Sequence, residues 1–255
     1  MDIQTIGIIG YGYVGQAVHA GFNKPSNRFV ICDPKHTDNI IEDVVDAEPA
    51  CIFVCVPTSN LDFTSLYVVL NRIELSGYQG VIVIKSTVLP HVVKNREVVA
   101  NPEFLSQRTA NEDFVRPPML LLGGNRANEV KLFYQDHSLV LTNKIFLTDN
   151  VTACMCKYMM NCFYATKICF MNVMHEIASG EGANSDDINN ILRSHEWMGT
   201  HHFDVPGPDG RKGFGGACLP KDMSMFADHY DVDMFHKILS INELQRNDPQ
   251  SFITD

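Results

Sequence analysis

The chain has 255 residues, 45% of them hydrophobic, and its 30 acidic against 20 basic side chains give a formal net charge of −10. This length can bury one sizeable core and favours two modest domains. No run of Lys and Arg is long enough to follow a phosphate backbone, which argues against nucleic acid as a partner. The start lacks the pattern of a secretory signal, and no segment is long and apolar enough to span a bilayer. We therefore expect a cytoplasmic protein that binds neither nucleic acid nor membrane.

Eight cysteines are spread along the chain. Several lie in apolar runs, which indicates reduced thiols rather than a disulfide framework. These are Cys51, Cys55, Cys162 and Cys169. Cys154 and Cys156 are separated by one residue, but no second cluster stands at zinc-site spacing. We expect no metal site.

The N-terminal segment predicts a strand, a tight glycine turn and a helix. The strand covers residues 3–9, the turn is Gly10-Tyr11-Gly12-Tyr13-Val14-Gly15, and the helix follows from residue 16. A second apolar run, 28–32, ends at Asp33, 18 positions after Gly15. A dinucleotide fold places the acid that binds a ribose hydroxyl at about this distance. The candidate cofactor-binding residues here are Gly10, Gly12, Tyr13, Val14, Gly15 and Asp33.

Each glycine of such a turn has a physical task. The first permits the turn, the second lets a pyrophosphate approach the backbone, and the third lets helix and strand pack closely. The start of the helix then favours the anion. Asp33 would repel the additional phosphate of NADP, whereas Lys35 and His36 could accommodate it. The sequence therefore favours NAD and leaves NADP open.

Further strands are predicted at residues 50–56, 81–84 and 119–122, and a short one at Val98-Val99. Polar turns containing proline follow the first two, and ligands bind at such carboxyl ends in open α/β sheets. The short strand leads to Asn101-Pro102-Glu103-Phe104-Leu105. Glu103 could serve as a general base or be a solvated loop carboxylate.

From Thr152 the pattern becomes helical and rich in Met, Cys and Phe. We therefore predict an α/β Rossmann-type domain over residues 1–148 and an all-helical domain, built around a long helix, over 149–255. Lys157 and Asn161 are four residues apart and lie on one helical face. From spacing alone, an exposed lysine and a surface asparagine are the simpler interpretation.

A segment rich in Gly, Pro and His, residues 198–211, leads into the loop Gly213 to Asp222. We expect this segment to be a mobile loop on the substrate side, and its His201 and His202 to be surface residues. Within the loop, glycines let backbone amides approach a ligand, and Lys221 would favour the thiolate of Cys218. Taken alone, an inert cysteine in a glycine-rich turn is the simpler interpretation. Helices are predicted around 225–226 and over 235–245.

Six motifs in this order resemble those of the nucleotide-sugar dehydrogenase family, whose members include UDP-glucose and GDP-mannose 6-dehydrogenases. The motifs are Gly10 to Gly15, Val56-Pro57-Thr58, Lys85-Ser86-Thr87-Val88, Asn101 to Leu105, Lys157 with Asn161 before Lys167-Ile168, and Gly213 to Asp222. The resemblance covers nearly the whole chain. It implies NAD-dependent oxidation of the C6 primary alcohol of a nucleotide sugar, UDP-glucose first, to the uronic acid.

The resemblance also implies two hydride transfers through a cysteine thiohemiacetal and thioester, and a homodimer formed through the helical domain. By motif position, Cys218 would be the nucleophile, Lys157 and Asn161 would stabilise the oxyanion, and Asp222 would assist proton transfer. Thr87 and Glu103 would position water or act as base. The remaining candidates are Val56, Pro57, Thr58 and Lys221 for the cofactor, and Phe104, Leu105, Phe214, Gly215 and Gly216 for the substrate.

The chain also departs from the family pattern. Family members are longer, and we expect the third domain, which would follow the helix ending near Arg246, to be absent and the grip on the substrate to be reduced. The connections 34–49 and 91–100 are short, which predicts shortened or lost helices. Ser106-Gln107-Arg108 and Cys154 replace residues usual in the family.

Two other functions stay open. One is a two-electron 3-hydroxyacid dehydrogenase, a group that also pairs a Rossmann domain with helices carrying a Lys and an Asn four apart but has no need of Cys218. The other is a non-catalytic nucleotide-binding subunit.

Overall fold

The computed structural model describes residues 3–58 and 61–247. The chain divides into two compact units, Met1–Lys157 and Tyr158–Asp255. This division falls inside the long helix α7 (Asn150–Gly180), whereas the boundary predicted from sequence lies before that helix. The two units are described separately below.

The first unit is built on a seven-stranded sheet of order β2-β1-β3-β4-β5-β6-β7. The strands are β1 Gln4–Ile9, β2 Asn27–Cys32, β3 Cys51–Val54, β4 Val81–Ile84, β5 Val98–Ala100, β6 Leu120–Gly123 and β7 Ile145–Thr148. All neighbouring pairs are parallel except β5 and β6, which are antiparallel. From β1 the strand order runs outward to β2 on one side and to β3 and β4 on the other, so it reverses between β1 and β3. Ligands bind at this point in such sheets.

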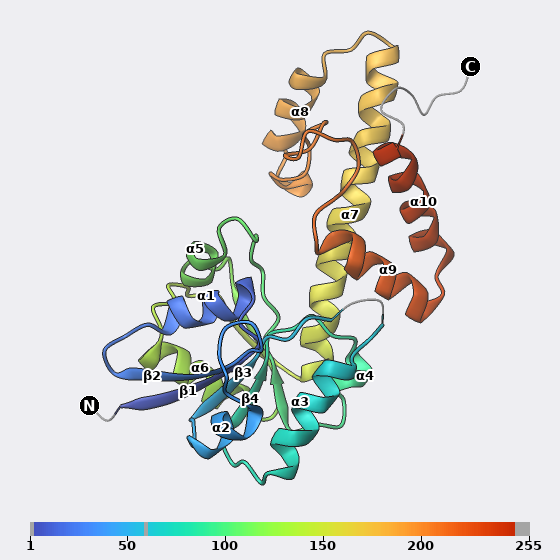
Figure 1. Cartoon of the computed structure of the whole chain (residues 1–255). Helices are drawn as coiled ribbons and strands as arrows, with labels where there is room; N and C mark the ends of the chain where they lie inside the picture. Colours follow the sequence, from blue (N-terminus) through green and yellow to red (C-terminus); the bar gives the residue numbers. More distant parts are fainter. Residues whose placement is uncertain (1–2, 59–60, 248–255) are drawn as a thin grey trace. The chain divides into compact units, whose positions relative to one another are not determined.

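Helices cover both faces of this sheet (Figure 1). On one face α1 (Tyr13–Phe22), α5 (Ala110–Val115) and α6 (Ala127–His137) pack on side chains that include Ile6, Ile8, Phe53 and Val83. On the other face α2 (Ile41–Asp46) and α3 (Thr64–Leu75) pack together. The central strands are apolar at every position because both of their faces are buried. The predicted α/β doubly wound fold is thereby confirmed.

The two short connections contain only short helices. The connection 34–49 contains α2, which has six residues. The connection 91–100 contains most of α4 (Pro90–Val93), which has four residues, and then leads into β5. Proline at the first position of α4 suits a helix start. The strand β7 and the helices α3, α5 and α6 were not predicted from the sequence.

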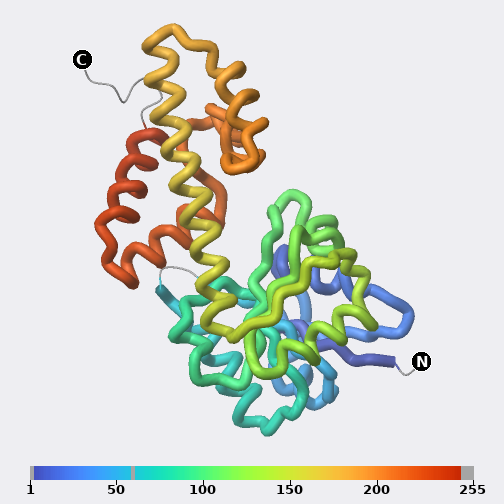
Figure 2. The backbone as a smooth tube through the Cα atoms, turned by 180° about the vertical axis from the view of Figure 1, so that it is seen from behind, coloured from blue at the N-terminus to red at the C-terminus, as the bar shows by residue number. Residues whose placement is uncertain are grey.

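The second unit, in its described part, is helical. After α7 come α8 (Ser185–Ser194), the 3₁₀ turn Glu196–Met198, α9 (Leu219–Tyr230) and α10 (Asp233–Asn247). In Figures 1 and 2, α8 and α10 lie on opposite sides of α7. The core of this unit joins α7, α9 and α10 through Cys162, Cys169, Phe214, Met223 and Ile238. Across residues 3–58 and 61–247, no helix is long and apolar enough to cross a membrane.

The segment 198–211 has no regular structure beyond the end of the 3₁₀ turn, but it is anchored. Phe203 is fully buried, and the ammonium of Lys167 lies 3.8 Å from the centre of its ring. Lys167 also donates hydrogen bonds to the carbonyls of Met198 and His201, each at 2.7 Å. The expectation of a mobile loop on the substrate side did not include this anchor, because a lone phenylalanine in a polar segment gives no periodic signal.

Candidate functional site

The glycine turn after β1 combines one close contact with one open position. Gly10 has φ +90°, and a Cβ there would lie 2.8 Å from the backbone of Cys55, in the loop after β3. A Cβ on Gly15 would lie 2.1 Å from the carbonyl oxygen of Gly10. Among the described residues, no atom outside Gly12 and its two chain neighbours lies within 4 Å of the position that a Cβ on Gly12 would take. The turn is therefore closed on its inner side and leaves room for a ligand at its middle glycine.

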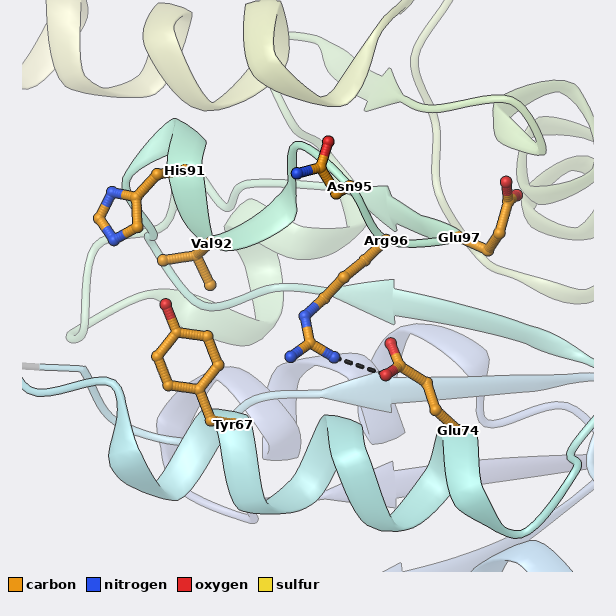
Figure 3. A pocket seen from close by; sticks show the side chains of 7 residues that line it. All are labelled: Tyr67, Glu74, His91, Val92, Asn95, Arg96 and Glu97. Carbon is orange, nitrogen blue, oxygen red and sulfur yellow. Dashed lines mark hydrogen bonds and ion pairs between the residues drawn. The ribbon is translucent and has the colours of Figure 1, made fainter.

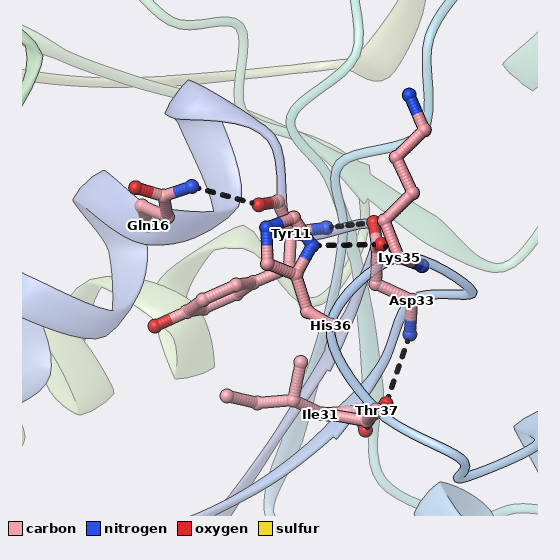
Figure 4. Close-up of polar contacts among 7 residues, drawn as sticks. All are labelled: Tyr11, Gln16, Ile31, Asp33, Lys35, His36 and Thr37. Carbon is pink, nitrogen blue, oxygen red and sulfur yellow. Dashed lines mark hydrogen bonds and ion pairs between the residues drawn. The ribbon is translucent and has the colours of Figure 1, made fainter.

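Asp33, at the end of β2, faces this turn (Figure 4). Its carboxylate accepts hydrogen bonds from the backbone N–H of Tyr11 at 2.7 Å and of Lys35 at 2.9 Å, and contacts Nδ1 of His36 at 2.9 Å. Partial burial acts to raise the pKa of Asp33, but these hydrogen bonds outweigh it and the net effect lowers the pKa. Asp33 is therefore held as an anion beside the turn.

Aromatic rings flank Asp33. The rings of Tyr11 and His36 meet edge to face with centres 5.4 Å apart, and the Tyr11 hydroxyl bonds Nδ1 of His19. The side chain of Lys35 extends away from Asp33 in Figure 4, so Lys35 contributes only its backbone amide there. Sequence reasoning missed Tyr11 and His19, because the motif defines only the glycines around them.

The loops that follow β3 and β4 are tied to each other. The hydroxyl of Thr58 donates to the carbonyl of Thr87 at 2.8 Å, and the hydroxyl of Ser86 donates to the carbonyl of Val56 at 2.6 Å. Thr58 and Thr87 are both buried. The motif containing Val56, Pro57 and Thr58 and the motif containing Thr87 are thus brought together at one edge of the sheet.

Lys85, directly after β4, is a buried lysine that sequence reasoning did not select. Its ammonium donates to Oδ1 of Asn101 at 3.0 Å, and the hydroxyl of Tyr134 donates to the same oxygen at 2.7 Å. Nδ2 of Asn101 donates to the carbonyl of Leu121 at 2.9 Å. Burial lowers the pKa of Lys85 to about 8. In the sequence, Lys85 stands between an apolar strand and a polar turn, and only the fold shows that its side chain points inward.

Glu103 and Lys157 form a buried pair in the first unit. The ammonium of Lys157 donates to the backbone carbonyl of Glu103 at 2.7 Å and lies 3.5 Å from its Oε1. Oε2 of Glu103 accepts the N–H of Leu105 at 2.6 Å, and the ring of Phe104 lies 5.2 Å from the ammonium. Both side chains are about 6% exposed. The simpler interpretations, an exposed lysine and a solvated loop carboxylate, are therefore wrong.

Asn161 and Asp222 form the corresponding polar contact of the second unit. Nδ2 of Asn161 donates to Oδ2 of Asp222 at 2.5 Å, and the ammonium of Lys221 lies 2.7 Å from Oδ1. Asp222 is 1% exposed and Asn161 is 6% exposed. Asn161 is therefore a buried residue rather than a surface one. Lys221, expected to act on Cys218, is ion-paired with Asp222.

Cys218 stands at the N-cap of α9, a helix of twelve residues. The N–H of Asp222 donates to the carbonyl of Cys218 at 2.8 Å, which closes the first turn. The positive end of the helix dipole favours negative charge at this position, and helix starts are a common location for reactive thiolates. Cys218 is half-buried, while the preceding Gly216 is exposed with φ +80°. The thiol therefore stands beside an open, positively polarised stretch of backbone.

A separate hollow of about 500 Å³ lies between α3 and residues 91–97 (Figure 3). Arg96 crosses it to bond Glu74 at 2.6 Å and Asn71 at 3.0 Å. None of the predicted site residues lines it. Within the described ranges, no three His, Cys, Asp or Glu side chains are grouped as metal ligands.

Comparison with known proteins identifies a family whose members are similar in sequence to this chain. The model of the UDP-glucose/GDP-mannose dehydrogenase family, central domain, matches residues 151–246. UDP-glucose 6-dehydrogenase of Rickettsia conorii is 31% identical over 204 residues, covering 74% of this chain and 46% of that protein. The chain spans about half the length of the curated relatives it matches.

Solved structures share the fold. A UDP-glucose dehydrogenase from Pyrobaculum islandicum gives a TM-score of 0.80 at 22% identity, covering 94% of this chain and 68% of that one. A 3-hydroxyisobutyrate dehydrogenase from Mycobacterium tuberculosis gives 0.74 at 14% identity, covering 94% of this chain and 93% of that one. At these identities the likeness concerns the arrangement of helices and strands.

Proposed function

The chain belongs to the UDP-glucose/GDP-mannose dehydrogenase family, and on this premise we propose that it oxidises the C6 primary alcohol of a nucleotide sugar, UDP-glucose first, to the uronic acid. The observation that carries the proposal is Cys218 at the start of α9, one helical turn before the buried Asp222 that Asn161 holds. This arrangement combines a nucleophile with a proton-transfer group and an amide donor.

NAD fits the residues of the first unit. The open position at Gly12 leaves room for a pyrophosphate, and the anionic Asp33 is suited to ribose hydroxyls and would repel the 2′-phosphate of NADP. When bound, NAD supplies the acceptor for a hydride. Val56, Pro57 and Thr58 would line the same edge of the sheet, and Lys221 is the further cofactor-side candidate.

The cysteine chemistry accounts for the second oxidation. The Cys218 thiolate adds to the carbonyl carbon of the aldehyde, and the C=O electron pair moves to oxygen. The thiohemiacetal would then lose a hydride, for which a second bound NAD would supply the acceptor, and a thioester on Cys218 would remain. Water then adds to the acyl carbon, and cleavage of the C–S bond releases the carboxylate and the thiolate. The sum is one alcohol, one water and two NAD⁺ giving one carboxylate, two NADH and three protons.

The other polar residues have assigned roles in this proposal. Lys157 and Asn161, one turn apart on α7, stabilise the negative oxygen, and Asp222 moves a proton. Thr87 and Glu103 position water or accept its proton. Phe104, Leu105, Phe214, Gly215 and Gly216 are assigned to the substrate side, Gly215 and Gly216 through their backbone.

A homodimer is part of the proposal, because α7 carries an exposed apolar stripe. Met159, Phe163, Phe170, Met174 and Ile177 are between 41% and 63% exposed, and their spacing places them on one side of the helix. Contiguous exposed apolar side chains mark interaction surfaces. Changing Phe163 and Phe170 to Glu should convert a dimer to a monomer in sedimentation velocity. A wild-type chain that already sediments as a monomer would refute the dimer.

The test of the activity counts NADH per substrate. Purified protein should form two NADH per UDP-glucose consumed, and Cys218→Ser should halt the reaction before the acid is released. Absence of NADH with UDP-glucose, GDP-mannose and other UDP-sugars would refute the enzyme proposal and favour a non-catalytic nucleotide-binding subunit.

A two-electron 3-hydroxyacid dehydrogenase is the second candidate. It is favoured by the fold shared with 3-hydroxyisobutyrate dehydrogenase over nearly the whole of both chains. One NADH per substrate, together with full turnover in Cys218→Ser, would favour this candidate over the four-electron enzyme.

A further inference from the structure

The loop that carries Cys218 is held by a side chain from another helix. Asn242, on α10, accepts the N–H of Phe214 through Oδ1 at 2.6 Å and donates from Nδ2 to the carbonyl of Phe214 at 3.1 Å. The side-chain amide thus pairs with both backbone groups of one residue, as a neighbouring strand would. Asn242 is 8% exposed and Phe214 is 1% exposed, so water does not replace these bonds.

Two further contacts fix the same end of the loop. The N–H of Gly213 donates to Oδ1 of Asn172, on α7, at 3.0 Å. A Cβ on Gly213 would lie 2.5 Å from Oδ1 of Asn242, and one on Gly215 would lie 2.7 Å from the guanidinium of Arg246. Gly213 is therefore required, because Asn242 stands directly against it and its φ is +71°, whereas the flexible guanidinium of Arg246 could move to admit a side chain at Gly215.

The helix that provides this support is itself fixed. Nε2 of Gln245 donates to the carbonyl of Cys169, on α7, at 3.1 Å, and Arg246 bonds Asp209 at 2.8 Å. In contrast, Gly216 and Ala217 are exposed, and in the part of the chain that the structure describes, no atom beyond the two chain neighbours of Gly216 lies within 4 Å of a Cβ placed on it. The loop is thus locked at residues 213–215 and open at 216–217.

We propose that Asn242 is a positioning residue for Cys218, which holds the loop so that the thiol stays at the start of α9 and the open backbone beside it stays available to the substrate. This inference rests on the proposed function for its consequence in turnover. Its consequence for the thiol itself requires neither NAD nor a sugar. Asn242 lies 24 positions after Cys218 in the sequence. It acts through the loop backbone and not by contact with the reacting atoms.

The first test measures the reactivity of the thiol. Iodoacetamide labelling of the folded protein from pH 6 to 9.5, with quantification of the Cys218 peptide by mass spectrometry, gives the alkylation rate. Asn242→Ala should lower this rate about tenfold, since misplacing a reacting group by about 1 Å can cost up to about 100-fold in rate. The half-buried Cys156 on α7 is the internal reference and should label at an unchanged rate.

Two variants separate positioning from stability. Asn242→Asp keeps the acceptor for the Phe214 N–H and should retain part of the rate, which also covers the case in which the alanine variant does not fold. Asn189→Ala, on α8, removes an equally buried asparagine, 7% exposed, away from the loop. In this variant Cys218 should be alkylated at the wild-type rate, even if the melting temperature of the protein falls.

Turnover supplies the second readout. Asn242→Ala should lower kcat for the second oxidation about 10–100-fold and leave KM for NAD unchanged. Wild-type alkylation profiles and kcat in both Asn242 variants would overturn the proposal. Absence of NADH formation by the wild type would refute the proposed function alone, because the alkylation profiles would still decide whether Asn242 positions Cys218.

Discussion

The two polar regions of the molecule are organised by different forces. At the sheet edge of the first unit, charged groups are buried: Lys157 is paired with the carboxylate of Glu103, and Lys85 donates to the neutral amide of Asn101. At the glycine loop of the second unit, neutral amides of Asn172 and Asn242 hold backbone groups. A buried charge that loses its partner costs much more free energy than a neutral group that does. The first region should therefore respond to pH and charge changes, and the second to shape.

The largest loss of stability is expected when the Glu103–Lys157 pair is broken. Lys157→Met leaves Glu103 buried without its cation and should lower the free energy of unfolding by about 3–5 kcal/mol, measured by urea denaturation with circular dichroism. Arg72→Met is the matched control, because its partner Glu42 and Arg72 are both more than 40% exposed. It should cost much less than Lys157→Met, because exposed ion pairs contribute little to stability. Equal losses in the two variants would remove the distinction between buried and exposed pairs.

The double variant sharpens this result. Glu103→Gln combined with Lys157→Met removes both charges and should recover much of the stability lost by Lys157→Met, because a buried pair replaced by neutral groups is often close to neutral. If the double variant were less stable than Lys157→Met, the pair would not be the reason for the loss.

The next effect is pH dependence at Lys85. Its folded pKa of about 8 lies below its ordinary value of 10.5, so between these pH values the unfolded chain binds more protons and stability rises with pH. The destabilisation is complete below about pH 8 and is relieved as pH approaches 10.5. The unfolding free energy of the wild type minus that of Lys85→Met should rise by about 3 kcal/mol between pH 7 and 10.5.

The matched control for this titration comes from the other region. The difference in unfolding free energy between the wild type and Asn242→Ala should stay flat over the same pH range, because the amide carries no charge. A flat profile for Lys85 as well would mean that its ammonium is better solvated than its burial indicates.

The smallest effect separates two glycines of one loop. Gly213→Ala combines φ +71° with a Cβ 2.5 Å from Oδ1 of Asn242 and should cost about 2 kcal/mol. Gly216→Ala has φ +80° but open space, and should cost about 1 kcal/mol. Thermal unfolding of both variants measures the difference. A larger loss at Gly216 would contradict the division of the loop into a locked and an open part.

The sequence predicted those parts of the molecule that depend on local pattern. Strand, glycine turn, helix and Asp33 follow one another within 33 residues, and periodicity alone indicated the helical second half. It did not predict β7, whose exposed Phe146 and Leu147 interrupt the expected alternation. Lys85 was placed in a motif but given no role, and Asn172 and Asn242 were not singled out, because a polar residue at a strand end or on a helix gives no signal of the group that it will contact. The roles of the site residues stay predictions.

The antiparallel joint in the sheet has a consequence for how the first unit opens. The register joins β5 to β6 through Ala100 and Gly123, and the side chain of Asn101 crosses to the carbonyl of Leu121 beside it. The side-chain amide of Asn101 thus adds a hydrogen bond between the strands where the backbone register is shortest. The same amide is the acceptor for Lys85. Above about pH 8, where part of the Lys85 population is neutral, separation of β6 from β5 would expose Lys85 to water and return its pKa toward 10.5, so that this opening is accompanied by the uptake of a proton.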